Sequence, residues 1–311
     1  MIFRVDTSYL DSLPEEACSD MFSEIASHGH FIDCDAQTRD KLYAASDKNG
    51  SKTQKQFLQR YNGFDITAEL RTYLRTIDLT ARCFSYQQIM DLVTLPSLFL
   101  LENEPYEWPV YRVLIGTYEN DRKFRNLFHL LVKAKNENRL IPDHCGGYTP
   151  MPAKIHFHEE NRYKEIFPFK SCILFDRDTD DAISFDYQKD PLFVKLTGKK
   201  SNEITDADIY TLSQGTYNWH MWYKRAIENY FPNAQYEAQG MDVSELPEVS
   251  AERDYKKICG NTVPGYDKNK LPKIAEKMSR TDYERNLKKF SLNQMTISEL
   301  QLLLLKLVKT I

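Results

Sequence analysis

Two short apolar segments of the chain each end in acidic residues. Residues 97–101 are followed by Glu102, and residues 171–175 are followed by Asp176-Arg177-Asp178. A short apolar run that is bounded by polar residues is typical of a buried strand. In open α/β sheets, ligands bind at the carboxyl ends of the strands. The pattern therefore predicts that at least three carboxylates meet at one edge of a sheet.

Residues 95–235 alternate between strand-like and helix-like segments. Residues 106–118 and 121–136 have apolar positions at helical spacing, and residues 139–145 and 217–223 are typical of two further strands. Strands that alternate with helices favour a parallel sheet. We therefore predict an α/β domain in which a parallel sheet is flanked by helices.

The two flanks have a different pattern. Residues 1–94 show several short stretches of helical spacing and no motif of chemistry, and residues 236–311 are polar and rich in lysine. We expect both to be mainly helical. The last predicted helix, 298–309, carries a stripe of five apolar side chains: Leu300, Leu303, Leu304, Leu307 and Val308. A stripe of this size predicts packing either on the chain's own helical domain or against a second copy or a partner.

Composition narrows the class of protein. The 311 residues are 41% hydrophobic and 28% charged, which is ordinary for a folded protein, and the formal net charge is −4. This charge does not indicate a protein that coats nucleic acid nonspecifically, although basic residues can still cluster on one part of the surface. No run is long enough for a membrane span, and the N-terminal residues lack the apolar region of a signal peptide. The six cysteines form no Cys-x-x-Cys motif. We therefore expect reduced thiols, a cytoplasmic protein and no membrane partner.

The predicted acidic edge favours a cation. Close carboxylates repel each other unless a cation lies between them, and hard oxygen ligands favour Mg²⁺ or Mn²⁺. Each acid alone has a simpler explanation. Glu102 could be a strand-end surface residue, and Asp176 and Asp178 could belong to a solvated acidic turn. Glu228 could be an acid in the first turn of a helix, where the helix dipole favours negative charge. Taken together and in this order, they predict a metal-dependent site that acts on phosphates.

The segment 95–235 resembles the Toprim fold of topoisomerases, primases and OLD-family nucleases. The Toprim signature is a Glu at the end of the first strand and Asp-x-Asp at the end of a later one, and Glu102 and Asp176/Asp178 match both. Gly146-Gly147 follows the expected middle strand. The segment Lys224–Tyr230 is similar to an Arg-x-x-Glu-Asn-Tyr element of OLD-related defence nucleases. Asn103 stands where Toprim domains usually have Gly, and Glu104 and Glu107 flank the usual place of a second acid.

This resemblance implies phosphodiester hydrolysis with one or two Mg²⁺ (or Mn²⁺) ions. Asp176 and Asp178 would hold a metal with Glu102, which is alternatively the general base. Glu228 would complete a second metal site, and Lys224 or Arg225 would stabilise charge on the phosphate. The chain has no Walker A motif. The resemblance therefore implies a nuclease effector of an anti-phage defence system that acts with a separate ATPase or sensor, and it leaves a homo-oligomer open.

Two other classes of protein remain open at this point. One is a non-catalytic Toprim-like module that binds nucleic acid or regulates a partner, in which the acids only shape the fold. The other is a phosphotransferase or phosphatase on a doubly wound α/β fold, where Asp-x-Asp also occurs. That class places its nucleophilic Asp on the first strand, whereas here the first strand ends in Glu102.

Overall fold

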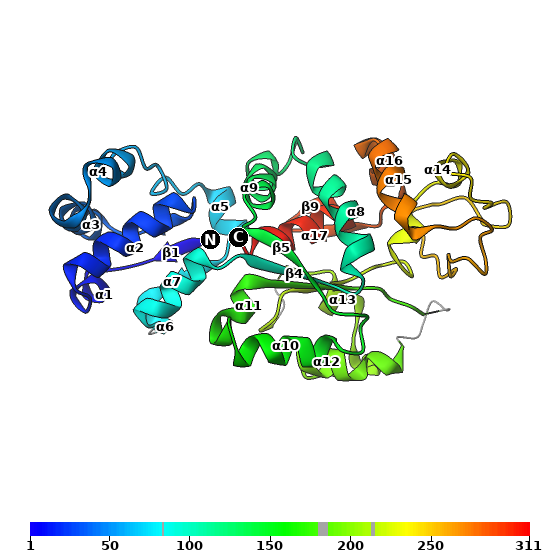
Figure 1. Cartoon of the computed structure of the whole chain (residues 1–311), viewed down its shortest axis with the longest axis horizontal. Helices are drawn as coiled ribbons and strands as arrows, with labels where there is room; N and C mark the ends of the chain where they lie inside the picture. The colour runs from blue at the N-terminus through cyan, green and yellow to red at the C-terminus, as the bar shows by residue number, and fades with distance from the viewer. Residues whose placement is uncertain (83, 180–185, 213–214) are drawn as a thin grey trace. The chain divides into compact units, whose positions relative to one another are not determined.

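The computed structural model describes residues 1–82, 84–179, 186–212 and 215–311 (Figure 1). Its contacts divide the chain into two units. Unit 1 comprises residues 1–96 and 309–311, and unit 2 comprises residues 97–308. The sequence predicted boundaries after residues 94 and 235. In the structure the chain passes from unit 1 to unit 2 after Pro96, and residues 236–308 belong to the same unit as the predicted catalytic domain.

Unit 2 contains a parallel sheet of four strands in the order β5-β4-β6-β7. The strands are β4 (Ser97–Leu101), β5 (Leu140–His144), β6 (Ser171–Phe175) and β7 (Trp219–Met221). The two apolar runs seen in the sequence form the central strands β4 and β6, and every residue of both is buried. Strands that are covered on both faces need continuous rather than alternating apolar residues. The predicted α/β class with a parallel sheet is therefore confirmed.

Helices cover both faces of this sheet (Figure 1). One face carries α8 (Glu104–Thr117), α9 (Arg125–Asn136) and α17 (Glu299–Val308), and the other carries α10 (Met151–Glu160) and α12 (Asp190–Thr197). The remaining helices and strands of unit 2 are α11 (Phe167–Lys170), α13 (Asp206–Ile209), α14 (Asn233–Glu237), α15 (Leu271–Lys277), α16 (Arg280–Asn286), β8 (Lys289–Leu292) and β9 (Met295–Ser298).

Unit 1 is mainly helical, as predicted for residues 1–94, but it also contains strands that the prediction did not include. It has a parallel sheet of three strands in the order β2-β1-β3, each three residues long. Phe3, Ile32 and Ile77 are the buried central residues of these strands. Strands this short show no recognisable alternation. The elements are β1 (Ile2–Arg4), α1 (Thr7–Asp11), α2 (Glu15–Ser27), β2 (Phe31–Asp33), α3 (Ala36–Asn49), α4 (Lys52–Leu58), α5 (Ala68–Tyr73), β3 (Thr76–Asp78), α6 (Leu79–Arg82) and α7 (Tyr86–Thr94).

The predicted helical region 236–311 is also mixed. Residues 238–267 form neither helix nor strand, because glycine and proline residues recur along them, and β8 and β9 pair as an antiparallel hairpin. Two short 3₁₀ helices matter for the site described below. They are η4 (Ile227–Tyr230) and η2 (Tyr187–Lys189).

Helix α17 is buried on all sides rather than on one face. All ten of its residues are buried, and it packs on α9 within unit 2. Its polar residues have partners inside the protein. The Glu299 carboxylate accepts hydrogen bonds from the Tyr223 amide and the Tyr230 hydroxyl, both at 2.6 Å, and Lys306 Nζ donates to the Trp219 carbonyl at 2.7 Å. The leucine stripe is therefore covered by the chain's own sheet domain.

None of the helices formed by the described residues is long and apolar enough to cross a membrane.

We predict that Leu303→Ala lowers the free energy of unfolding by about 2–5 kcal/mol, because Leu303 is 1% exposed and the substitution leaves a cavity. Urea denaturation followed by circular dichroism measures this change. Val194→Ala on α12 is the control, since Val194 is 46% exposed and should cost less than about 1 kcal/mol. Light scattering should give the same mass for both variants. A stable Leu303→Ala variant with a smaller mass would instead place α17 in an interface.

Candidate functional site

The site lies where the order of strands in the sheet reverses. The chain leaves β4 toward β5 on one side, and it leaves the adjacent β6 toward β7 on the other. Such a reversal opens a crevice beyond the carboxyl ends of the two strands. Glu102 directly follows β4 and Asp176 directly follows β6. The Asp176 amide donates a hydrogen bond to Glu102 Oε1 at 2.9 Å, so the two strand ends are joined.

A cavity of about 280 Å³ occupies this crevice. The four predicted metal ligands, Glu102, Asp176, Asp178 and Glu228, all line it, and so does Arg225. The other lining residues follow β4, belong to or adjoin η4, or come from the C-terminal segment 257–268: Asn103, Ala226, Asn229, Lys257, Ile258, Cys259, Tyr266 and Lys268.

The Asp-x-Asp segment is held by the chain that follows β7. The amides of Arg177 and Asp178 both donate to the Arg225 carbonyl, at 2.8 and 3.2 Å. Asp178 has a φ of 59°, a left-handed conformation that short polar side chains tolerate. Arg177 points into the protein, where its Nε donates to the Trp222 carbonyl at 3.2 Å. The turn therefore buries the middle residue and leaves both aspartates on the cavity. Asp180 and Asp181, which continue the acidic run, lie outside the described residues.

Glu228 reaches the cavity from η4. Its Oε1 accepts a hydrogen bond from the Tyr266 hydroxyl at 2.9 Å and lies 3.4 Å from Lys268 Nζ. Its Oε2 is buried and has no hydrogen-bond partner among the residues that the structure describes. A buried carboxylate oxygen without a partner is costly, so a ligand at this oxygen would be favourable.

The structure does not bring Lys224 into the cavity, although Arg225 beside it is there. Lys224 Nζ donates to the backbone carbonyls of Asn229 and Ser250, at 2.9 and 2.6 Å. Burial lowers the pKa of Lys224 to about 8. This geometry gives Lys224 a role in holding the loop at Ser250, and it leaves Arg225 as the basic residue of this pair that faces the acids.

Glu107 is a fifth acid of the site. It lies in the first turn of α8, is 4% exposed, and accepts a hydrogen bond from the Asn103 amide at 3.2 Å. From the sequence, Glu107 was identified only as a residue near the position where Toprim domains usually have a second acid. Asn103 has a φ of −130°, so the turn after β4 does not need the left-handed conformation that glycine favours.

Two lysines of the site were not predicted as site residues from the sequence. Lys189, at the end of η2, lies 2.8 Å from Asp178 Oδ2 and 3.5 Å from Glu102 Oε1. Lys268 pairs with Glu228, as described above. Their place in the site depends on tertiary contacts, so no local pattern of the sequence would put them here.

Three acids of the site, Glu102, Glu107 and Asp176, lie close together and are buried, and both conditions raise their pKa values. Burial, together with the charge of Glu102, raises the pKa of Glu107 to about 8. Burial also raises the pKa of Asp176 well above its usual value, and the neighbouring carboxylates of Glu102, Glu107 and Glu228 add to this. The pKa of Glu102 is raised by burial as well, although Lys189 opposes the shift. The acids are thus close enough to resist simultaneous ionisation.

The carboxylates are not arranged around a single metal position. Over the described ranges, no group of three or more His, Cys, Asp or Glu side chains is placed to hold a metal ion as the structure stands. Lysine ammonium groups lie against Asp178, Glu102 and Glu228 instead.

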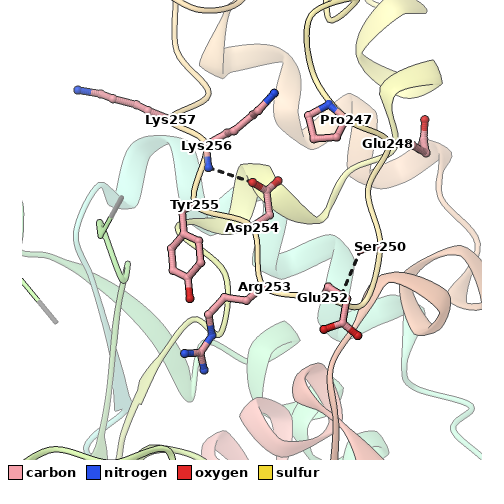
Figure 2. A pocket seen from close by; sticks show the side chains of 9 residues that line it. All are labelled: Pro247, Glu248, Ser250, Glu252, Arg253, Asp254, Tyr255, Lys256 and Lys257. Atoms are coloured by element: carbon pink, nitrogen blue, oxygen red, sulfur yellow. Dashed lines mark hydrogen bonds between the residues drawn. The ribbon is translucent and has the colours of Figure 1, made fainter. Parts of the chain in front are cut away.

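A larger cavity of about 550 Å³ is formed by residues 247–257 (Figure 2). Its charged side chains have mixed signs, and Arg253 pairs with Asp206 at 2.8 Å. Lys257 lines this cavity as well as the acidic one. We place the functional site in the smaller cavity, because the predicted acids converge there.

Comparison with models of known protein families, with curated proteins and with solved structures gives no match for this chain. The interpretation of the site therefore depends on its own motifs and geometry.

We predict that Glu107→Gln flattens the pH dependence of stability in metal-free buffer. The folded pKa of Glu107 is about 8 and its ordinary value is 4.5. The folded protein therefore binds more protons than the unfolded chain between these values. Its extra stability is complete below pH 4.5 and is lost as the pH rises through about 8.

Urea denaturation from pH 4.5 to 8 with EDTA should show a loss of up to about 4 kcal/mol in the wild type and a smaller loss in Glu107→Gln. Glu104→Gln, a change in the same helical turn, controls for the loss of one carboxylate. Equal slopes for the wild type and Glu107→Gln would show that this carboxylate is not buried beside the other acids.

Proposed function

We propose that this chain is a Mg²⁺-dependent nuclease that hydrolyses phosphodiester bonds. The observation that carries the proposal is the convergence of Glu102, Asp176, Asp178 and Glu228 on one cavity at the reversal point of a parallel sheet. This is the place where open α/β sheets bind ligands. It is also the arrangement that the Toprim resemblance implies.

The donor set fits a hard divalent cation. All the acidic side chains offer oxygen, which Mg²⁺ and Mn²⁺ prefer over softer ligands. Among the described residues, the buried Oε2 of Glu228 has no hydrogen-bond partner, and burial together with the neighbouring carboxylates raises the pKa of Asp176. Asp176 and Glu228 would hold the cation together with Glu102 or Asp178. When bound, it would polarise the scissile phosphate and lower the pKa of a coordinated water.

The basic residues of the cavity would bind the substrate. Arg225, Lys257 and Lys268 lie on its wall. A guanidinium can bind two phosphate oxygens at once, and an ammonium acts as a point charge. These groups offset the repulsion between the acids and a phosphodiester. They would also stabilise the charge that develops on the phosphate during hydrolysis.

The role of toxic effector in an anti-phage defence system, acting with a separate ATPase or sensor, comes from the resemblance alone. The sheet domain supplies no nucleotide-binding Walker A loop in this sequence. DNA and RNA are both substrates to be tested, since the phosphodiester chemistry is the same for each.

A second candidate function is a non-catalytic module that binds nucleic acid or a partner. One observation favours it: Lys189 and Lys268 already neutralise part of the acidic cluster. In that case the acids serve the fold, and divalent cations have no specific place in the cavity.

We predict that Asp176→Asn and Glu228→Gln each reduce cleavage on the order of 100-fold or more, because each removes a ligand of the cation that stabilises the transition state. Purified protein is incubated with Mg²⁺ or Mn²⁺ and with plasmid, single-stranded DNA or transfer RNA. Glu159→Gln is the matched control, since Glu159 pairs with Lys195 in the same unit but outside the cavity.

Wild-type activity in the Asp176→Asn variant would contradict the metal site. Wild-type protein that binds these substrates and cleaves none of them, with either cation, would support the binding module instead.

A further inference from the structure

Lys189 lies in a cage of oxygen atoms at the end of the sheet. Its Nζ donates to the Asp176 carbonyl at 2.7 Å and to Asp178 Oδ2 at 2.8 Å, and Glu102 Oε1 lies 3.5 Å away. The side chain of Lys189 is 0% exposed. An ammonium group has three N–H donors, so these three oxygens match its full capacity.

The remaining side of the cage is aromatic. Lys189 Nζ lies 4.0 Å from the centre of the Tyr148 ring, a cation–π distance. The Tyr148 hydroxyl donates to Gln188 Oε1 at 2.8 Å, so the ring is tied to η2, which also carries the lysine. Glu102 follows β4, Tyr148 follows β5, and Asp176 and Asp178 follow β6. The cage is therefore built from the ends of three adjacent strands.

We propose that Lys189 is an internal counter-ion that occupies the place of a divalent cation between Glu102 and Asp178. It holds these two carboxylates together without metal, and it must release them before a cation can bind both. This inference rests on the proposed function, because the same carboxylates are its metal ligands.

The chemistry of the cage supports this role. An ammonium and a divalent cation compete for the same carboxylate oxygens, and their like charges prevent both from occupying one position. Removing one partner of a buried ion pair is strongly destabilising, because the other charge stays behind without compensation.

The test is thermal unfolding of the full chain with EDTA and with Mn²⁺. We expect Lys189→Met to lower Tm in EDTA by roughly 5–10 °C, because Glu102 and Asp178 lose their counter-ion. Mn²⁺ should then raise Tm of this variant by about 5 °C more than it raises Tm of the wild type. Lys195→Met is the control. Lys195 also follows η2 along the chain and pairs with Glu159, at 2.6 Å, outside the cavity.

The double variant Lys189→Met/Asp178→Asn separates charge from packing. It removes one charge of each sign, so its Tm in EDTA should be higher than that of Lys189→Met, and its extra response to Mn²⁺ should disappear. If Lys189→Met is unfolded in EDTA, we expect Mn²⁺ to fold it, and this outcome also supports the inference. An equal Mn²⁺ response in Lys189→Met and the wild type, or no folding of Lys189→Met under either condition, would overturn the inference.

Failure of the proposed function gives a different result. If the extra Mn²⁺ response is present while the wild type cleaves no nucleic acid, the counter-ion role stands and the nuclease proposal fails.

Discussion

The main constraint on unit 2 is that several carboxylates are buried close together at the carboxyl end of its sheet. Glu102 and Asp176 follow the two central strands, and the Asp176 amide donates directly to the Glu102 carboxylate. Burial and mutual repulsion raise the pKa of Glu102, Glu107 and Asp176. Burying carboxylates that repel each other lowers the stability of the fold, so the packing of the buried strands and helices must offset this cost. The buried carboxylates need positive charge nearby, either from lysine ammonium groups or from a divalent metal cation.

The rest of unit 2 supplies and supports this charge. Near the end of the irregular segment 238–267, the Tyr266 hydroxyl donates to Glu228, and Lys268 directly follows the segment. The same segment is anchored by Lys224, which binds the Ser250 carbonyl, and by the Arg225 amide, which donates to the Asp254 carbonyl at 2.9 Å. Helix α17 closes the sheet from one face and binds Tyr223 and Tyr230 through Glu299. The C-terminal residues are thus part of the site's framework rather than a separate region.

The sequence predicted the part of this site that depends on continuous apolar runs. Strands β4 and β6 are buried on both faces, so their patterns and the acids after them could be recognised. Glu228 was found only through its similarity to a known motif, because η4 has no periodicity. Lys189 and Lys268 could not be found, since their position depends on tertiary contacts. For the same reason, the sequence could not show which of Lys224 and Arg225 faces the acids, because the partners of Lys224 at Asn229 and Ser250 are brought together only by folding.

The central claim is that the acids at the ends of β4 and β6 form a site for a divalent cation. A crystal of the wild-type protein grown with Mn²⁺ tests it most directly, through the anomalous scattering of the metal. The account predicts an anomalous peak in the cavity about 2 Å from carboxylate oxygens of Asp176 and Glu228, with Glu102 or Asp178 as a further ligand. Absence of a peak at saturating Mn²⁺, with Lys189 still between Glu102 and Asp178, would contradict it.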